Sequence, residues 1–349
     1  MTDSLATLKT FLPGLEALLE DPEVTEIMIN GPGNAWAERA GAGLEQVEAP
    51  QLDDRALRRA AISIARPLGL DPKTDPALDA RLPDGSRVAI TTPPAAPHVA
   101  ITIRRFGNRS FSVQDLVDNG SLTPAIVDSA KDALRNRENI LVSGGTGSGK
   151  TTLLNALIEL LPHHERIVSI EDTLELRIEQ ANVVRFEARE LGEGSLTIRD
   201  LVRHSLRHRP DHIVVGEVRG QEAADLLQAL NTGHGGSLTT VHANNARAAL
   251  SRLASCAMQA GELPWEVVCR SVVDGISLVL HMTRLKGRRY VEEALLLRSW
   301  QAEDNAWLTD QVAVRPRAAS TPPRSRRRRS ESGRPALAAN LRPRDSNLV

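Results

Sequence analysis

The stretch ENILVSGGTGSGKTTLLNALIELL, residues 138–161, decides the expected fold. It begins with an apolar run typical of a buried strand, passes through a glycine cluster and ends in a helical pattern. Residues 144–151 satisfy the pattern GxxxxGK[ST] in full, between that strand and that helix. Such a loop turns successive backbone N–H groups onto phosphate oxygens, and the helix that follows adds its positive end. The stretch therefore predicts a nucleoside-triphosphate site, a P-loop.

Each residue type in this loop has an expected role. Lys150 would neutralise the β- and γ-phosphates, and the Thr151 hydroxyl would ligate Mg²⁺. A GTPase would carry NKxD and DxxG, and neither tetrapeptide occurs in the chain. ATP with Mg²⁺ is therefore the predicted ligand. The predicted phosphate-binding residues are Gly144, Gly145, Thr146, Gly147, Ser148, Gly149, Lys150, Thr151 and Thr152.

The composition is that of a globular chain of about two domains, with 349 residues, 41% hydrophobic and 25% charged. Its two cysteines form no CxxC motif, which argues against a disulfide framework or a structural zinc site and fits a reducing cytoplasm. No signal peptide is visible. The longest apolar candidate, SVVDGISLVLHM, is too short to span a bilayer. We therefore expect a soluble, cytoplasmic chain.

The first part of the chain, residues 1–105, predicts a small α+β domain. Leucines spaced three or four apart predict a helix over residues 4–20, and a second apolar face predicts one over about 52–66. Strands are expected in VTEIMIN, AWAER and HVAITIRRF, with a hairpin around Asp84-Gly85. Residues 106–122 are interpreted as a linker.

Residues 123–314 alternate between strand and helix patterns, which is typical of a mostly parallel sheet with helices on both faces. Helices are expected near 196–207 and 222–231, and antiparallel strands around Lys286-Gly287. The strand candidates are NILVS, RIVSIE, HIVVG and SLTTVHA. The expected fold class is α/β, a P-loop domain preceded by the small α+β domain.

Two carboxylates follow apolar strands. In IVSIEDTLEL, Glu171 and Asp172 end a strand, beside the crevice where a parallel sheet binds nucleotide. Glu171 could hold Mg²⁺ through water or orient the attacking water; a helix N-cap at Asp172 is the alternative. In RPDHIVVGEVRG, Glu217 would polarise the water that attacks the γ-phosphate, and Gly216 stands where many P-loop enzymes carry Asp.

Two histidines, His234 and His242, lie eight residues apart in TGHGGSLTTVHANNA. A lone histidine is commonly a structural hydrogen-bonding residue. Two in a glycine- and threonine-rich segment beside a P-loop are interpreted as γ-phosphate sensors. A zinc site is disfavoured, because no third ligand lies at suitable spacing.

The tail, residues 315–349, holds ten arginines against two acidic residues, a net charge of +8 in a chain whose net charge is −1. Its proline, serine and charge predict disorder. Contact with nucleic acid, contact with an anionic membrane surface and a solvated extension without a partner all stay open.

In this order, the P-loop, SIEDTLEL, RPDHIVVGEVRG and TGHGGSLTTVHANNA resemble the Walker A, Asp box, Walker B and His box of the secretion ATPase superfamily. That superfamily powers type II and type IV secretion, pilus and conjugation machines. VTEIMING and RLPDGSRV match it too, so the resemblance covers about residues 10–300. The missing tetracysteine module favours the conjugal-transfer branch. The glycine at 216 fits the superfamily, whose Walker B lacks the usual Asp.

The resemblance implies a RecA-like P-loop domain and a homo-hexamer with ATP between the two domains. The ring would act with inner-membrane components of the machine, as a peripheral protein on the inner face of the membrane. Arginines outside the P-loop would stabilise the transferring phosphoryl group. The candidates are Arg81, Arg87, Arg104 and Arg105, with Arg203, Arg207 and Arg219 behind them.

Three functions stay open at this point. The first is an ATPase that powers conjugative type IV secretion, in pilus biogenesis and DNA or protein transfer. The second is a pilus assembly or retraction motor of the same superfamily. The third is an ATP-switched nucleic-acid-binding protein that grips through residues 315–349, although few aromatics argue against base stacking.

Overall fold

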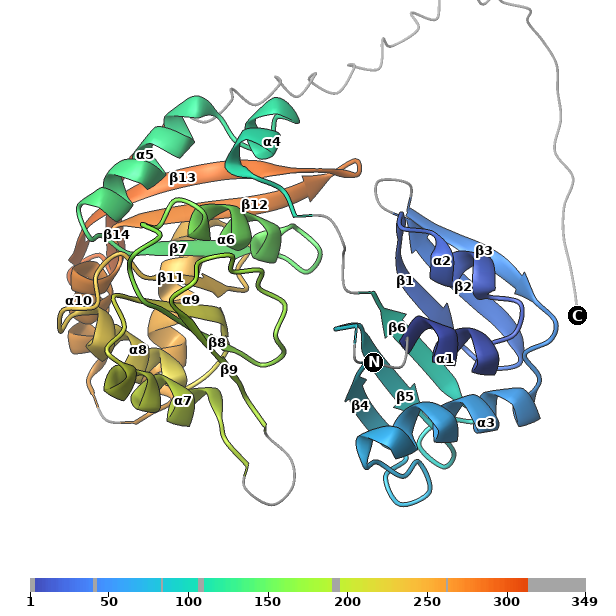
Figure 1. Cartoon of the computed structure of the whole chain (residues 1–349). Helices are drawn as coiled ribbons and strands as arrows, with labels where there is room; N and C mark the ends of the chain where they lie inside the picture. The colour runs from blue at the N-terminus through green and yellow to red at the C-terminus, as the bar shows by residue number, and fades with distance from the viewer. Residues whose placement is uncertain are drawn as a thin grey trace, which may run out of the picture. The chain divides into compact units, whose positions relative to one another are not determined.

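The computed structural model describes residues 4–39, 43–82, 84–105, 110–189, 195–261 and 263–312. The arginine-rich tail therefore lies outside the described residues, and its predicted disorder and partners stay predictions. The chain forms two sheets, one in each expected domain (Figure 1). The α/β fold class is confirmed, and the domain boundaries stay a prediction.

The N-terminal domain is a six-stranded antiparallel sheet in the order β3-β2-β1-β6-β5-β4. Leucines of the first helices and Leu57 of the third pack with Ile27 and Ile101 of the sheet in one buried core. The elements are α1 (Ser4–Phe11), α2 (Glu16–Glu20), β1 (Val24–Ile29), β2 (Gly33–Arg39), β3 (Gly43–Ala49), α3 (Asp54–Ala65), the 3₁₀ turn η1 (Arg66–Leu68), β4 (Ala77–Arg81), β5 (Arg87–Thr91) and β6 (Ala100–Arg104).

The structure differs from the sequence analysis at three places in this half of the chain. The helix expected over 4–20 is broken, because Pro13 cannot continue the hydrogen-bond ladder and Gly14 turns the chain at φ +88°. Strand β3 was not expected, since its polar residues lie on an exposed sheet edge. The expected linker contains the helix α4 (Val113–Asp118), which Ser112 and Asp115 cap reciprocally.

The C-terminal domain is an eight-stranded sheet in the order β14-β13-β12-β7-β11-β10-β8-β9. Strands from β12 through β9 in that order are parallel, and β13 and β14 are antiparallel. The elements after α4 are α5 (Pro124–Arg135), β7 (Ile140–Gly144), α6 (Lys150–Ile158), β8 (Ile167–Glu171), β9 (Val183–Glu187), α7 (Ile198–Ser205), the 3₁₀ turn η2 (Leu206–His208), β10 (His212–Val218), α8 (Glu222–Leu230), β11 (Leu238–Val241), α9 (Ala246–Met258), α10 (Trp265–Gly275), β12 (Leu278–Leu285), β13 (Arg288–Gln301) and β14 (Ala306–Gln311).

Helices cover both faces of this sheet. One buried core joins α7 to α10 to the sheet, and a second joins α4, α5 and α6 to the opposite face (Figure 1). Because β7, β8, β10 and β11 run parallel, their carboxyl ends meet at one edge. That edge receives the P-loop, the Asp box, Glu217 and His242 from four separate segments of the chain.

Among the described helices, none has the length and apolar character that crossing a bilayer requires.

Candidate nucleotide site

The P-loop joins β7 to α6 through backbone conformations that suit only glycine. The φ angles of Gly144, Gly147 and Gly149 are 155°, 68° and 99°. A Cβ atom on Gly144 would lie 2.4 Å from Ser148 Oγ and 2.5 Å from the carbonyl oxygen of Met282. The loop therefore needs a glycine at residue 144, and it places Lys150 at the first turn of α6.

Lys150 is a buried cation without a direct carboxylate partner among the described residues. Its Nζ donates to the carbonyl oxygens of Gly144 and Gly145, each at 3.2 Å. Burial lowers the pKa of Lys150, and the charge of Glu217 opposes that shift. A cation held by weak carbonyl acceptors remains available to an anion, so this position suits a phosphate group.

His242 stands between Lys150 and Glu217. Its Nε2 lies 3.1 Å from Lys150 Nζ and 3.0 Å from Glu217 Oε1. Burial lowers the pKa of His242; the charge of Glu217 opposes the shift and that of Lys150 adds to it. The ring is therefore neutral at pH 7 and can accept or donate one hydrogen bond. These contacts bring the P-loop, the Walker B strand and the His box into one cluster.

The carboxylate of Glu217 is asymmetric. Its Oε2 accepts from Arg219 Nη2 at 3.0 Å. Its Oε1 is buried and accepts no hydrogen bond among the described residues, and the contact with His242 lacks hydrogen-bond geometry. A buried acceptor without a donor suits a group that takes a proton from a bound water.

The site fits a triphosphate and Mg²⁺. The glycine turn, the uncompensated charge of Lys150 and the unpartnered buried hydroxyl of Ser148 all suit phosphate oxygens. No group of three or more His, Cys, Asp or Glu side chains in the described part of the chain could hold a metal. The P-loop pattern assigns a Mg²⁺ ion to the Thr151 hydroxyl, where phosphate oxygens and water would be the further ligands.

Comparison with known proteins agrees with this geometry. The model of the type II/IV secretion system protein family matches residues 13–306. The chain belongs to that family. The resemblance inferred from the four motifs is thereby confirmed.

Individual relatives of this secretion-family chain carry informative names. The probable conjugal transfer protein TrbB of Sinorhizobium fredii is 36% identical over 277 residues, which cover 78% of this chain and 82% of that protein. The type IV secretion system protein VirB11 of Brucella suis is 33% identical over 310 residues, covering 79% and 86%. Among solved structures, the pilus retraction motor PilT with bound ADP has a TM-score of 0.61 at 21% identity, covering 85% and 84%; it shows a shared fold.

In the structure of this secretion-family chain, Glu171 is buried at the turn after β8. The sequence predicted that it would lie beside the nucleotide. Its carboxylate is 2% exposed and accepts from the backbone N–H of Glu175 at 2.6 Å and of Leu176 at 2.7 Å. Arg185 Nη2 approaches the other oxygen at 3.3 Å. Burial raises the pKa of Glu171 against these bonds. The carboxylate holds the turn after β8, and these contacts give no support to its predicted roles in Mg²⁺ binding and water activation.

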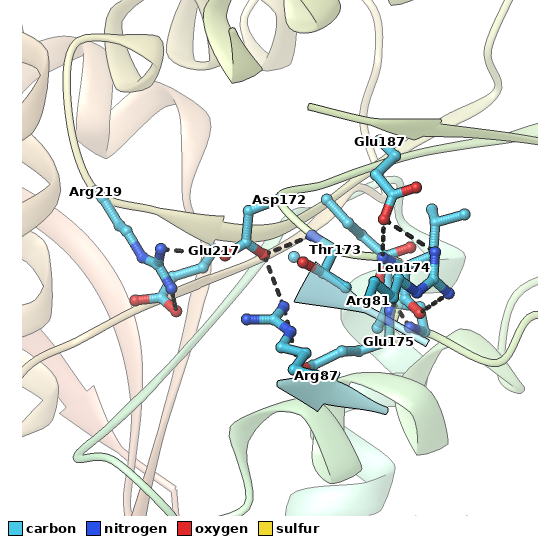
Figure 2. A network of polar contacts seen from close by, with 12 residues as sticks. Arg81, Arg87, Asp172, Thr173, Leu174, Glu175, Glu187, Glu217 and Arg219 are labelled. Carbon is cyan, nitrogen blue, oxygen red and sulfur yellow. Dashed lines mark hydrogen bonds and ion pairs between the residues drawn. The ribbon is translucent and has the colours of Figure 1, made fainter. Parts of the chain in front are cut away.

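Asp172, the next residue, faces the cluster instead. Its Oδ2 accepts from Arg219 Nη1 at 3.1 Å, and Arg219 in turn bonds Glu217 (Figure 2). Asp172 Oδ1 accepts from the backbone N–H of Thr173 at 2.9 Å. The sequence placed Asp172 with Glu171 beside the nucleotide crevice and offered a helix cap at Asp172 as the alternative; no helix begins there.

His234 does not join the cluster. It precedes β11 whereas His242 follows that strand, and four strand residues span roughly 13 Å. His234 Nδ1 bonds the carbonyl of Ala229 at 3.1 Å, at the amino edge of the sheet. The prediction that both histidines sense the γ-phosphate is therefore corrected: only His242 lies beside the P-loop lysine.

The four candidate arginines of the N-terminal domain have different partners. Arg104 is near enough for its charge to contribute to the lowered pKa of Lys150. Arg105 bonds the carbonyl oxygen of Asp21 within its own domain. Arg81 pairs with Glu187 at 2.9 Å, and Arg87 contacts Asp172 at 3.3 Å and Glu175 at 3.1 Å (Figure 2). Arg104 is thus the one of the four with an electrostatic link to the P-loop, and a role of any of them at phosphate stays a prediction.

Two arginines that the sequence reasoning missed reach the P-loop from the β12–β13 hairpin. Arg289 Nε donates to the carbonyl of Gly147 at 2.8 Å. Its strand partner Arg284 pairs with Glu38 of β2 at 3.1 Å. Burial lowers the pKa of Arg289, with Arg284 adding to the shift. The segment RLKGRRY predicted the hairpin. Its high density of cations beside a turn was the sequence signal that could have identified these two arginines.

Proposed function

We propose that this chain hydrolyses ATP and that the hydrolysis powers a conjugative type IV secretion machine. The observation that carries the proposal is the cluster of Lys150, His242 and Glu217, in which three distant segments meet at the P-loop. A structural glycine turn would have no need of a buried cation and an unpartnered buried carboxylate oxygen beside it.

The residues divide the chemistry among them. Lys150 neutralises charge on the β- and γ-phosphates, and the loop amides hold the phosphate oxygens. Bound Mg²⁺ supplies further positive charge at those oxygens. Glu217 takes the proton of the attacking water on Oε1, and neutral His242 holds the water or the γ-phosphate by a hydrogen bond.

The machine is inferred from the relatives. Proteins named for conjugal transfer and for type IV secretion align with most of this chain. By analogy, the chain acts as a homo-hexamer with inner-membrane components of the machine, as a peripheral protein on the cytoplasmic face. The arrangement of ATP between two domains would let hydrolysis move one domain against the other.

Purified protein tests the enzymatic half. Lys150→Ala should lose nucleotide affinity and turnover, whereas Glu217→Gln should bind ATP and hydrolyse it about 10²- to 10⁴-fold more slowly. Lys131→Ala, an exposed lysine on α5, is the matched control and should behave as wild type. Wild-type turnover in Lys150→Ala would refute the P-loop mechanism. Mass in solution with and without ATP and Mg²⁺ tests the ring.

A transfer assay tests the cellular half. In a donor strain without the gene, the wild-type chain should restore DNA transfer and Glu217→Gln should not. Restored transfer by Glu217→Gln would separate hydrolysis from secretion. Unchanged transfer in the deletion strain would show that the chain serves another machine.

A further inference from the structure

The guanidinium of Arg219 bridges two carboxylates that follow different strands. Its Nη2 donates to Glu217 Oε2 at 3.0 Å, and its Nη1 donates to Asp172 Oδ2 at 3.1 Å (Figure 2). Glu217 is 15% exposed and Asp172 29%, whereas the arginine side chain is 57% exposed. The two carboxylates are thus more buried than the guanidinium that joins them.

The backbone at Arg219 is fixed as well. Glu222, at the start of α8, accepts the backbone N–H of Arg219 at 2.6 Å and of Gly220 at 2.8 Å. Because the chain is anchored at this turn, the side chain starts from a defined position. A planar guanidinium with two donors engaged then has little rotational freedom.

Asp172 is itself held from two sides. Its Oδ1 accepts from the backbone N–H of Thr173 at 2.9 Å and from Arg87 Nη2 at 3.3 Å. Arg87 belongs to β5 of the N-terminal domain. The contacts therefore form a series from Arg87 through Asp172 and Arg219 to Glu217, with alternating charges.

This series explains why the two oxygens of Glu217 differ. Arg219 occupies Oε2, so Oε1 is the oxygen that turns toward His242 without a hydrogen bond. Without Arg219 the carboxylate plane could turn about its last side-chain bond, so that neither oxygen would be held toward His242. An exposed ion pair contributes little to folding, so orientation is the effect to expect from this bridge.

We infer that Arg219 is a positioning residue for ATP hydrolysis, which holds Glu217 with Oε1 toward the attacking water, and that Asp172 acts through Arg219. The inference rests on the proposed function. Neither residue contacts the phosphate groups in this role. Loss of either should therefore lower kcat and leave nucleotide binding intact.

The experiment compares Arg219→Gln, Arg219→Lys, Asp172→Asn and the double variant Arg219→Gln/Asp172→Asn in the full chain. Arg219→Gln should lower kcat by up to about 100-fold, the order expected for a misplaced catalytic group. Arg219→Lys keeps the charge but engages one carboxylate at a time, so its kcat should lie between those of Arg219→Gln and wild type. KM and the Kd for ADP should stay within about twofold of wild type in all of them.

The double variant tests the series. If Asp172 acts through Arg219, Asp172→Asn should lower kcat in the wild-type background and have no further effect in Arg219→Gln. Arg298→Gln is the matched control: Arg298 is similarly exposed, at 58%, and pairs with Asp310 at 2.7 Å on the β13–β14 edge. It should leave kcat and KM unchanged.

Wild-type kcat in Arg219→Gln would overturn the inference, and so would independent losses that multiply in the double variant. A rise in the Kd for ADP that accompanies the fall in kcat would assign Arg219 to nucleotide binding, and this result would also overturn the inference. If Arg219→Gln proves misfolded by thermal melting, Arg219→Lys carries the same kcat-against-KM comparison. Absence of ATPase activity in the wild-type chain would instead refute the proposed function itself.

Discussion

His242 Nε2 lies 3.0 Å from Oε1 of Glu217. The same ring nitrogen is 3.1 Å from the ammonium of Lys150. A neutral imidazole in this place lies between the cation and the carboxylate and forms an ion pair with neither. A protonated one would pair with Glu217 and repel Lys150.

The first prediction concerns the pH dependence of turnover. Because the pKa of His242 is lowered from 6.5, the ring takes up a proton only below that pH. We expect kcat to be level from pH 7 to 8 and to fall at a pH below the ordinary histidine pKa of 6.5. His242→Asn should be slower throughout and should lose the part of the acid-side fall that belongs to the ring. Identical profiles for the two proteins would exclude His242 as the titrating group.

The second prediction concerns the glycine at the start of the P-loop. Gly144→Ala should abolish measurable nucleotide binding, because the new methyl group meets Ser148 Oγ and a backbone carbonyl and the residue has a φ of 155°. Overpacking of this kind also costs about 1–3 kcal/mol of stability. In Gly145→Ala the new Cβ has open space around it, so nucleotide affinity and stability should both fall clearly less than in Gly144→Ala. Titration with a fluorescent ADP and urea unfolding measure both effects, and equal losses in the two variants would contradict the steric argument.

The third prediction separates Glu171 from the catalytic carboxylate. Glu171→Ala leaves the backbone N–H groups of Glu175 and Leu176 without their acceptor and removes one of the two contacts of Arg185 Nη2, so the free energy of unfolding should fall by about 2–4 kcal/mol. Glu171→Gln keeps an acceptor for the amides, and its kcat should stay within a few-fold of wild type, in contrast to Glu217→Gln. A folded but inactive Glu171→Gln would return Glu171 to the catalytic group.

The fourth prediction concerns the β12–β13 hairpin. Arg289→Ala removes the bond to the Gly147 carbonyl and should loosen the P-loop. A loss of about 1–2 kcal/mol would raise the Kd for ADP roughly 5- to 30-fold. Arg288→Ala, at the exposed neighbouring residue of the same strand, is the control and should bind as wild type. Equal Kd values for the two variants would show that the hairpin lies beside the P-loop without stabilising it.

The P-loop could be predicted from the sequence because its chemistry is local. Residues 144–151 and their flanks are sufficient to predict the turn, the helix start and the place of Lys150 in the first helical turn. The parallel sheet was equally accessible, since strand and helix patterns alternate along the chain. Glu217 and His242 followed from their places after apolar strands, and the structure puts both beside Lys150.

The structure differs from the expectations for Glu171 and His234 in where the side chains lie, and the residue types themselves were not the cause. Glu171 is the last residue of β8, whose five residues are all buried, whereas Asp172 lies just beyond the strand and its side chain contacts Arg219. His234 and His242 share a motif but lie at opposite ends of β11. No local pattern decides which face or which end a side chain occupies; that is settled by the packing of the whole sheet.

Arg289 illustrates a second limit. The sequence indicated a hairpin at Lys286-Gly287, and β12 and β13 do form one. That its cations lie against the P-loop follows only from the pairing of β12 with β7, which are more than a hundred residues apart. Contacts between residues so far apart along the chain produce no periodic pattern in a single sequence.

The central place of β7 has a consequence for how the protein can respond to a ligand. All five of its residues are buried, and it pairs with β11 on one side and β12 on the other. Its amide hydrogens should therefore exchange with deuterium only when the domain unfolds globally. Loading and release of nucleotide should therefore leave this strand unaltered, so that it serves as a fixed base for the P-loop that follows residue 144.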